Sequence, residues 1–374
     1  MKRIAIIGTG VSGLTAAYLL SKKHQVSVFE KSSIIGGHTA TVDVELAEQH
    51  YAIDTGFIVF NNKFWWLVKE ILRFNKLCKK SYQAKNYDES STLGEFLQKN
   101  DFGYYFAEHY ILPMGAAIWS SSLVQMQDFQ FHFFVKFFHN HGLLNIADRP
   151  QWYVVPGGSR SYLAPLCEPF VDNIHLNADI KKITRENNQV QLCFANGEVQ
   201  TFDEVVIACH SDQALALLGD ASQHEQEILG AIPYSENSVV LHTDINLLPK
   251  RKKAWASWNY QLSANRAKPA SVTYNMNILQ GLNSSHTFCV TLNQREDIEP
   301  SKILREFIYH HPVFSTDSIN AQQQRLAICG QQHTHFAGAY WYSGFHEDGV
   351  RSAVDVAQRF DCYLQQSGPS QNNG

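Results

Sequence analysis

Three glycines near the N-terminus have types and spacing that suit phosphate binding. Gly8, Gly10 and Gly13 follow an apolar run and open a helix-forming segment. In this pattern the first glycine permits a tight turn, the second lets the backbone approach a pyrophosphate, and the third lets helix and strand pack closely. The helix N-terminus at Val11 and Ser12 then presents unpaired N–H groups and a partial positive charge. These residues predict a dinucleotide site.

A carboxylate stands at the position that a dinucleotide ribose requires. Glu30 ends the next apolar segment, 22 residues after Gly8, and is followed by Lys31. A carboxylate there can accept hydrogen bonds from both ribose hydroxyls. The alternative is a glycine-rich turn with a surface glutamate, but the predicted strand, turn, helix and carboxylate follow one another in the order and spacing of a dinucleotide site. This order and spacing favour the nucleotide interpretation.

Two later features favour FAD over NAD. A second glycine pair, Gly36–Gly37, closely follows the carboxylate, and Phe336–Ala339 with Glu347–Val350 predicts a strand, loop and helix far along the chain. We expect this helix to begin at Gly349, where its N-terminus would stabilise negative charge on the pyrimidine edge of a reduced flavin. An NAD domain usually completes itself in one contiguous stretch.

Local patterns indicate the elements that position these residues. Continuous apolar runs predict buried parallel strands, and a Thr92–Glu95 capping box and an Asn196–Gly197 turn mark a helix start and a hairpin. The predicted first unit is strand 3–7, helix 12–22 and strand 25–30, and a further buried strand is Val205–Ala208. Strands 238–243, 254–260, 271–276 and 287–292 should form a second, mixed sheet, before strand 335–339 and helix 349–363.

We therefore predict an α/β protein with a Rossmann-like FAD-binding domain interleaved with an α+β substrate domain. The FAD-binding domain should comprise residues 1–60, 152–235 and 330–366, and the substrate domain residues 61–151 and 236–329. The last residues, 367–374, are polar and should form a disordered tail.

The motifs resemble the flavin amine oxidase and phytoene desaturase superfamily, over nearly the whole chain. More closely, the chain resembles bacterial flavoproteins that are related to the N-terminal oxidase-like part of plant cyclopropane fatty acid synthases. The segments that carry it are Asp54–Phe60, Leu112–Trp119, Phe138–Leu144, Ala254–Tyr260 and Gly344–Gly349. The resemblance implies an amine-oxidase-like fold and a lipophilic substrate, such as a methylated or cyclopropanated fatty acyl chain.

The resemblance also implies where FAD binds. The adenine end matches Gly8 to Gly13, Glu30 and Ile180, and the flavin ring matches Gly56, Phe57, Gly338 and the start of the last helix. The flavin should be non-covalent, because Tyr340–Phe345 contains no cysteine. The predicted cofactor-binding residues are Gly8, Gly10, Val11, Ser12, Gly13, Glu30, Lys31, Gly36, Gly37, His38, Thr39, Gly56, Phe57, Ile180, Gly338, Glu347, Asp348, Gly349 and Val350.

Three positions depart from the superfamily pattern. His38 replaces the usual arginine after the glycine pair, and Ala339 replaces a common acidic residue, so flavin affinity should be modest. In the resembling proteins several tens of residues separate the segments that abut here at Asn62–Lys63. We interpret that join as a stretch absent from this sequence rather than a natural deletion.

Hydride transfer is chemistry of the cofactor, so the protein must mainly position substrate and exclude water. The catalytic candidates are His242, Tyr340 and Tyr342, and Trp255, Trp258 and Tyr260 could line an apolar slot. Each could instead be an ordinary core residue. His139 and His141 should cap a helix end, because their spacing suits no helical metal face, and we expect no metal.

Composition excludes several classes of protein. The formal net charge of -4 disfavours a nucleic acid partner, and seven scattered cysteines without a C-x-x-C pair disfavour a disulfide framework and fit a reducing cytoplasm. No apolar run is long enough for a transmembrane span. The Phe-rich segment 129–139 is either core or a lipid-contacting surface, which would place the protein peripherally at the inner membrane.

The sequence is compatible with three functions. The first is an FAD-dependent oxidoreductase that dehydrogenates a lipophilic substrate. The second is an oxidase of small amines. The third is a non-catalytic flavin-binding protein that presents lipid to a partner methyltransferase.

Overall fold

The computed structural model describes residues 1–37, 41–46, 49–54, 65–84, 91–145, 153–261 and 265–364. Four predicted cofactor-binding residues lie outside these ranges: His38, Thr39, Gly56 and Phe57. The Asn62–Lys63 join and the predicted tail also lie outside them.

The chain divides into two compact units. Unit 1 comprises Met1–Ala40, Arg160–Pro233 and Asn320–Gly374, and unit 2 comprises Thr41–Ser159 and Tyr234–Ile319. The bounds of these units differ from those of the expected domains. Residues 41–60, expected in the FAD-binding domain, belong to unit 2, and residues 320–329, expected in the substrate domain, belong to unit 1. The functional domain boundaries themselves stay a prediction.

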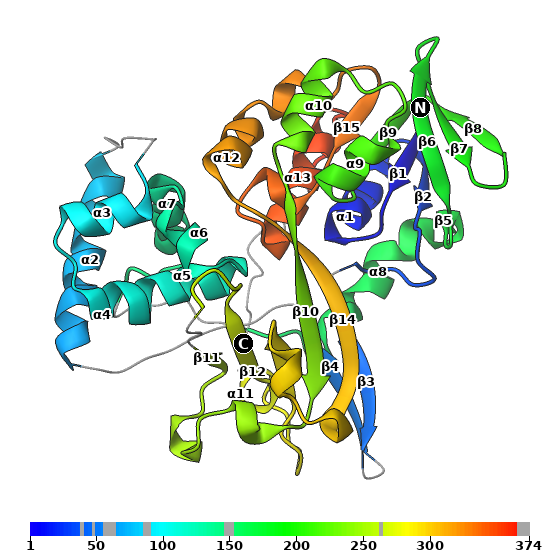
Figure 1. The fold of residues 1–374 in the computed structure, drawn as a ribbon. Helices are drawn as coiled ribbons and strands as arrows, with labels where there is room; N and C mark the ends of the chain where they lie inside the picture. The colour runs from blue at the N-terminus through cyan, green and yellow to red at the C-terminus, as the bar shows by residue number, and fades with distance from the viewer. Residues whose placement is uncertain are drawn as a thin grey trace, which may run out of the picture. The chain divides into compact units, whose positions relative to one another are not determined.

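Unit 1 contains a five-stranded parallel sheet in the order β15-β9-β1-β2-β5. Its strands are β1 (Arg3–Ile7), β2 (Gln25–Phe29), β5 (Ile174–His175), β9 (Glu204–Ile207) and β15 (Thr334–Phe336). Strand β9 is buried throughout, as expected for an inner strand of a sheet covered on both faces. Helices α1 (Val11–Leu20) and α13 (His346–Gln358) pack against each other beside this sheet (Figure 1). The predicted parallel sheet is confirmed.

A smaller antiparallel sheet completes unit 1, with the order β6-β7-β8. The predicted hairpin turn at Asn196–Gly197 is confirmed, and Gly197 has the positive φ of 85° that such a turn favours. The strands are β6 (Ile180–Glu186), β7 (Gln189–Phe194) and β8 (Val199–Phe202). The remaining helical segments are η2 (Ser159–Tyr162), which begins at the unit boundary, α8 (Leu163–Cys167), η3 (Glu168–Asn173), α9 (Ser211–Leu217), α10 (Gln223–Gly230), η8 (Arg325–Ala327) and η9 (Ala339–Trp341).

Unit 2 contains a five-stranded sheet in the order β11-β12-β13-β10-β14. We expected a mixed sheet of four strands, which is wrong: every pairing is antiparallel, and β14 is a fifth strand. Its alternating exposure explains the miss, because an edge strand with charged and histidine side chains has no continuous apolar run. The strands are β10 (Tyr234–His242), β11 (Trp258–Gln261), β12 (Ser271–Asn275), β13 (Cys289–Leu292) and β14 (Ile303–Pro312).

A hairpin that the sequence analysis did not predict packs on this sheet. It consists of β3 (Thr41–Leu46) and β4 (Gln49–Asp54). Val44, Tyr51 and Ile53 of the hairpin share a core with the side chains of β10 and β13. Short segments connect the strands: η4 (Ile245–Leu247), η5 (Lys252–Ala254), α11 (Met276–Gln280), η6 (Arg295–Asp297) and η7 (Pro300–Lys302); α12 (Thr316–Gln323) crosses the unit boundary.

The helical part of unit 2 is built around aromatic side chains. The Phe-rich segment forms α7 (Phe131–Asn140), and Phe131, Phe134, Phe137 and Phe138 are buried, so it is core rather than a lipid-contacting surface. The other helices are α2 (Trp65–Ala84), α3 (Leu93–Lys99), α4 (Tyr104–Phe106), the π-helical turn η1 (Ala107–Ile111), α5 (Leu112–Trp119) and α6 (Leu123–Gln127). The predicted capping box at the start of α3 is confirmed. Among the described residues, no helix is long and apolar enough to cross a bilayer.

Candidate functional site

The turn between β1 and α1 contains three glycines. A side chain would clash with the fold at Gly8 and Gly13 but not at Gly10. Gly8 has a φ of 99°, and a Cβ there would lie 3.2 Å from the Ala208 carbonyl oxygen. A Cβ on Gly13 would lie only 2.0 Å from the Gly8 oxygen, so helix and strand could not pack. A Cβ on Gly10 would meet no atom within 4 Å. Gly10 therefore borders open space at the position predicted for a pyrophosphate.

Glu30 lies directly beside this turn. One carboxylate oxygen accepts hydrogen bonds from the backbone N–H of Thr9 at 2.9 Å and from its hydroxyl at 2.5 Å. The other accepts from the backbone N–H of Ser32 at 2.9 Å and from its hydroxyl at 2.6 Å. Burial alone would raise the pKa of Glu30, but the hydrogen bonds from Ser32 and Thr9 lower it below 4.5. The carboxylate is therefore ionised at neutral pH and oriented by its own loop.

The second glycine pair contacts the first turn. The Gly36 N–H donates to the Thr9 carbonyl at 3.1 Å, and a Cβ on Gly37 would lie 3.1 Å from the Gly10 Cα. The two glycine segments thus form one surface around Gly10. Of the other predicted residues nearby, Lys31 is exposed, and Ile180 is buried at the start of β6.

The predicted start of the last helix needs correction. Helix α13 begins at His346, so Gly349 is its fourth residue rather than its first. The reason is Asp348, whose carboxylate accepts hydrogen bonds from the backbone N–H groups of Ser343 at 3.2 Å and Phe345 at 3.0 Å and so closes the loop ahead of the helix. A carboxylate in the first turn also complements the helix dipole.

Gly349 brings the first turns of α1 and α13 together. A Cβ on Gly349 would lie 2.6 Å from Val11 Cγ1 and 2.9 Å from Ser12 Oγ, so the helices approach this closely because residue 349 has no side chain. Gly338 is tied to the same helix, since its N–H donates to Ser352 Oγ at 2.9 Å. Two helix N-termini thus meet near Gly10, each with a partial positive charge that favours an anionic ligand. Glu347 is exposed and Val350 is half-buried in this turn.

Tyr340 and Tyr342 are held by the interior of unit 1. Tyr340 is buried, and the side-chain amide of Gln322 donates to the carbonyls of both tyrosines at 2.7 Å. The hydroxyl of Tyr342 donates to Asp355, and burial together with this carboxylate raises the pKa of Tyr342. The backbone at this segment is therefore rigidly placed. The catalytic assignment of either tyrosine stays a prediction.

His242 belongs to unit 2 and is fully buried on β10. Its Nδ1 accepts from the Asp244 backbone N–H at 3.1 Å, and its Nε2 lies 2.7 Å from the Thr291 hydroxyl. The Thr291 hydroxyl lies 2.8 Å from that of Thr273. Burial lowers the pKa of His242 to about 4, so the ring is neutral and Nε2–H donates to Thr291. These contacts favour the structural interpretation of His242.

The other singled-out side chains are also tied into unit 2. The indole N–H of Trp255 donates to the Pro249 carbonyl at 2.7 Å, and Trp258 packs edge-on against Tyr274. His141 caps α7, with Nδ1 2.9 Å from the Phe137 carbonyl, as expected. Within the described ranges, no cluster of His, Cys, Asp and Glu could hold a metal ion.

Sequence reasoning missed the residues that orient the predicted site. Thr9 and Ser32 hold the carboxylate of Glu30, and Ser352 holds Gly338. A hydroxyl residue inside the glycine turn and another two positions after the carboxylate were the available signals for the first two. Ser352 had no local signal, because its partner lies 14 residues away.

Comparisons with known proteins agree with this geometry. Residues 6–71 match the family model of the NAD(P)-binding Rossmann-like domain, and residues 68–252 match the model of the flavin containing amine oxidoreductases. An L-amino-acid oxidase of Bothrops jararacussu is 24% identical over 267 residues, which cover 57% of this chain and 53% of that protein. The chain thus spans about half the length of the curated relatives it matches.

Solved structures share the fold along most of the chain. A triple mutant of putrescine oxidase superposes with a TM-score of 0.68 at 12% identity, covering 96% of this chain and 99% of that one. A CLA-producing fatty acid isomerase from P. acnes superposes with a TM-score of 0.59 at 16% identity, covering 96% and 98%. These structures show that the chain has an amine-oxidase-like α/β fold, and residues 68–252 match the family of flavin containing amine oxidoreductases.

Proposed function

We propose that this chain is an oxidoreductase that dehydrogenates a lipophilic substrate by hydride transfer to non-covalently bound FAD. The observation that carries the proposal is the open space at Gly10, bordered by the touching first turns of α1 and α13. When bound, FAD supplies the hydride acceptor. The chain's own residues bind and orient the cofactor and exclude water.

Named groups fit the parts of FAD. The backbone N–H groups of Val11 and Ser12 would hold the pyrophosphate, and the ionised carboxylate of Glu30 would accept the ribose hydroxyls. The first turn of α13 around Gly349 would favour negative charge at the pyrimidine edge of the reduced flavin. His38, Thr39, Gly56 and Phe57 remain predictions of further contacts.

A pair of glycine variants tests the cofactor site. Gly10→Val should keep the fold but abolish flavin retention, because its side chain would occupy the space proposed for the pyrophosphate. Gly13→Val should instead lower the free energy of unfolding by more than about 3 kcal/mol, because its Cβ overlaps the Gly8 oxygen. Flavin absorbance and urea unfolding separate the two effects. Equal flavin content in wild type and Gly10→Val would refute the proposed site.

A milder variant tests the ribose contact. Glu30→Gln keeps one oxygen acceptor but removes the charge, so FAD affinity should fall about tenfold without loss of the fold. Titration of the apoprotein with FAD measures this change. An unchanged affinity would show that Glu30 does not contact the ribose.

Non-covalent binding has a simple test. Acid precipitation should release the yellow colour into the supernatant, because Tyr340–Phe345 offers no cysteine to the ring. Colour that stays with the pellet would contradict this part of the proposal.

The lipophilic substrate is supported by two likenesses. One is the sequence resemblance to the oxidase-like part of cyclopropane fatty acid synthases, and the other is the shared fold with a fatty acid isomerase. Anaerobic addition of phospholipid bearing methylated or cyclopropanated chains should bleach the flavin absorbance. The matched control is phospholipid with straight saturated chains, and equal bleaching by both would reject the substrate class.

Oxidation of an amine or amino acid is the second candidate, supported by the similarity to L-amino-acid oxidases. Release of hydrogen peroxide with small amines or amino acids, and not with lipid, would establish it. A third candidate is a non-catalytic partner of a lipid methyltransferase. Stable binding of such a methyltransferase together with a flavin that no substrate bleaches would favour that role.

A further inference from the structure

Helix α2 carries a one-sided basic surface that no part of the proposed reaction uses. Its 20 residues include five bases and a single acid, Glu70. At 3.6 residues per turn, four of the lysines fall within about 100° of the helix circumference. The buried side chains of Phe74 and Cys78 lie on the opposite side. We define the basic face of α2 as Lys69, Lys76, Lys79 and Lys80.

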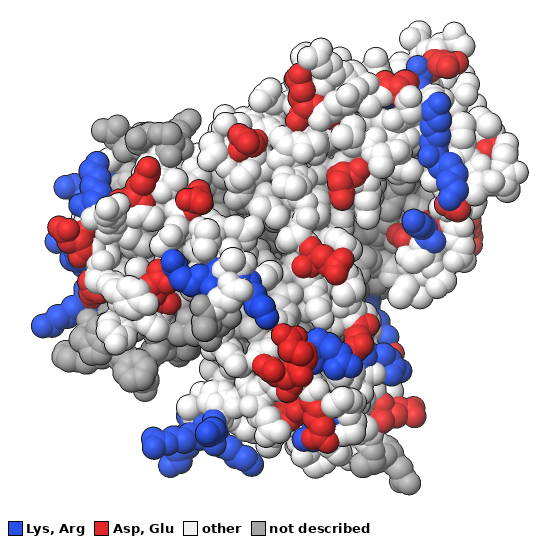
Figure 2. Space-filling model, in the orientation of Figure 1, with Lys and Arg blue, Asp and Glu red and all other residues white. Residues whose placement is uncertain are grey.

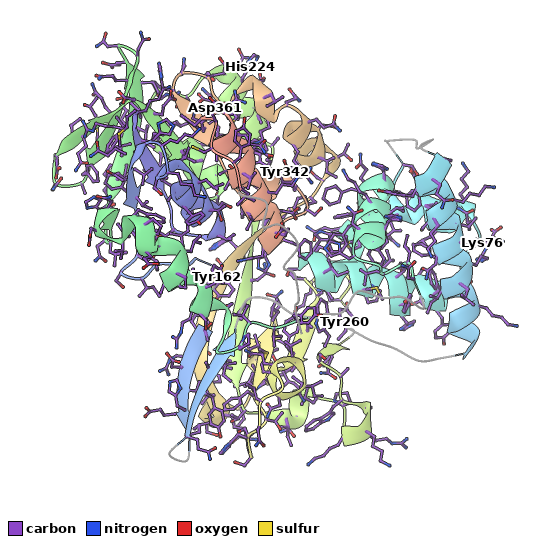
Figure 3. The ribbon with its side chains drawn as sticks, turned by 180° about the vertical axis from the view of Figure 1, so that it is seen from behind. Lys76, Tyr162, His224, Tyr260, Tyr342 and Asp361 are labelled. Atoms are coloured by element: carbon purple, nitrogen blue, oxygen red, sulfur yellow. The ribbon has the colours of Figure 1, made fainter. Side chains whose placement is uncertain are left out.

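The remaining charged residues of α2 are used by the fold. The Arg73 guanidinium lies over the Phe102 ring at 4.0 Å, and Glu70 accepts the Gly103 N–H at 3.1 Å. The basic face differs, because none of its four lysines forms an ion pair with any other described residue. Lys76 points outward from the helix (Figure 3). Figure 2 shows basic side chains at the edge of unit 2 where Figure 1 draws α2, with some acidic ones beside them.

Exposed apolar side chains lie on α2 and on the neighbouring helix α4. Leu72, on the same side of α2, is 47% exposed. Tyr104 and Tyr105 on α4 are 70% and 61% exposed, and α4 follows Gly103, which is bonded to α2 through Glu70. Tyrosine rings are enriched at membrane interfaces, where one end of the ring is apolar and the other is hydrated.

We propose that the basic face of α2 docks this protein on an anionic lipid bilayer, with Leu72 and Tyr104 entering the headgroup region. A cluster of lysines on an amphipathic helix binds anionic lipid, with a gain of about fivefold in partition for each lysine near the surface. The net charge of -4 opposes a nucleic acid as the partner. Docking requires no turnover, so it can fail or hold independently of the proposed reaction.

Vesicle binding tests the proposal directly. The purified full chain should co-sediment with vesicles of phosphatidylcholine and phosphatidylglycerol, but not with phosphatidylcholine alone, and salt should weaken the binding. Lys69→Gln combined with Lys76→Gln and Lys80→Gln should lower the partition about a hundredfold, as three factors of about five. Leu72→Ser combined with Tyr104→Ser should lower the vesicle partition that remains at high salt, because this part of the binding comes from apolar contacts.

A second basic run provides the matched control. Lys250, Lys252 and Lys253 are exposed in the segment after β10, so changing all three to Gln removes the same charge elsewhere in unit 2. This variant should bind vesicles like wild type. Equal losses in both triple variants, or equal binding to neutral and anionic vesicles, would overturn the proposal. Far-ultraviolet circular dichroism and flavin content verify that each variant is folded.

Discussion

Each unit buries a histidine on a strand of its sheet, but the pKa values of the two rings are shifted in opposite directions. In unit 1, His335 on β15 lies 3.2 Å from Glu204, which also accepts a hydrogen bond from Lys2 at 2.6 Å. Burial lowers the pKa of His335, but contacts with Cys329 and Glu204 outweigh it and raise the pKa above 6.5. In unit 2, burial lowers the pKa of His242 to about 4.

The difference shows that burial alone does not decide the charge of a histidine. His335 has a buried carboxylate as its partner, so the protonated ring is stabilised. His242 has a hydroxyl and a backbone N–H as partners, which favour the neutral ring. The buried contacts of unit 1 therefore favour the protonated form of His335, and those of unit 2 favour the neutral form of His242.

Glu204→Gln should have the largest effect, because it removes the buried carboxylate that both Lys2 and His335 contact. The free energy of unfolding should fall by about 3 kcal/mol, measured by urea denaturation at pH 7. Glu186→Gln, at the exposed end of β6, serves as the control and should change stability by less than about 0.5 kcal/mol. Equal effects of the two substitutions would show that the contacts of Glu204 with Lys2 and His335 do not stabilise unit 1.

The two histidines should give stability slopes of opposite sign with pH. For His242 the folded pKa is depressed, so its contribution is complete above pH 6.5 and is lost as the pH falls toward about 4, by about 3 kcal/mol. For His335 the folded pKa is raised, so its contribution is complete below pH 6.5 and is lost as the pH rises through the folded value. Urea unfolding from pH 4 to 9 of His242→Gln and His335→Gln should remove the acid and the alkaline decline, respectively.

Thr291→Val should reveal the neutral network of unit 2. It removes the hydroxyl that accepts from His242, leaving a buried N–H without a partner, so the free energy of unfolding should fall by about 2 kcal/mol. Thr291→Ser keeps the hydroxyl and should restore at least half of that loss. A Val variant as stable as wild type would show that the hydrogen bond from His242 contributes nothing to stability.

Thr273→Val should have the smallest effect. Among the described residues, the Thr273 hydroxyl forms a hydrogen bond with the Thr291 hydroxyl. Thr291 would still accept its hydrogen bond from His242 in this variant. We expect a loss of about 1 kcal/mol in thermal or urea unfolding. A loss larger than that of Thr291→Val would reverse the order of importance along the network.

The sequence by itself determined features that depend on neighbouring residues. The strand, turn and helix around Gly8 to Gly13, the capping box of α3 and the turn at Gly197 were predicted correctly. In each of these the geometry is set within a few residues, by a glycine without a Cβ or by a side chain that bonds its own backbone. The resemblance to flavoproteins rested on the same local motifs.

Only the tertiary structure decided the features that depend on distant partners. The edge strand β14 forms because β10 pairs with it, and the close approach of α13 to α1 depends on Gly349, where a Cβ would overlap Val11 and Ser12. The direction of the pKa shift of each buried histidine follows from its partners: His335 is paired with Glu204, 131 residues away. Such partners are set by folding, because a pKa depends on desolvation and on nearby charge, neither of which is a property of the local sequence.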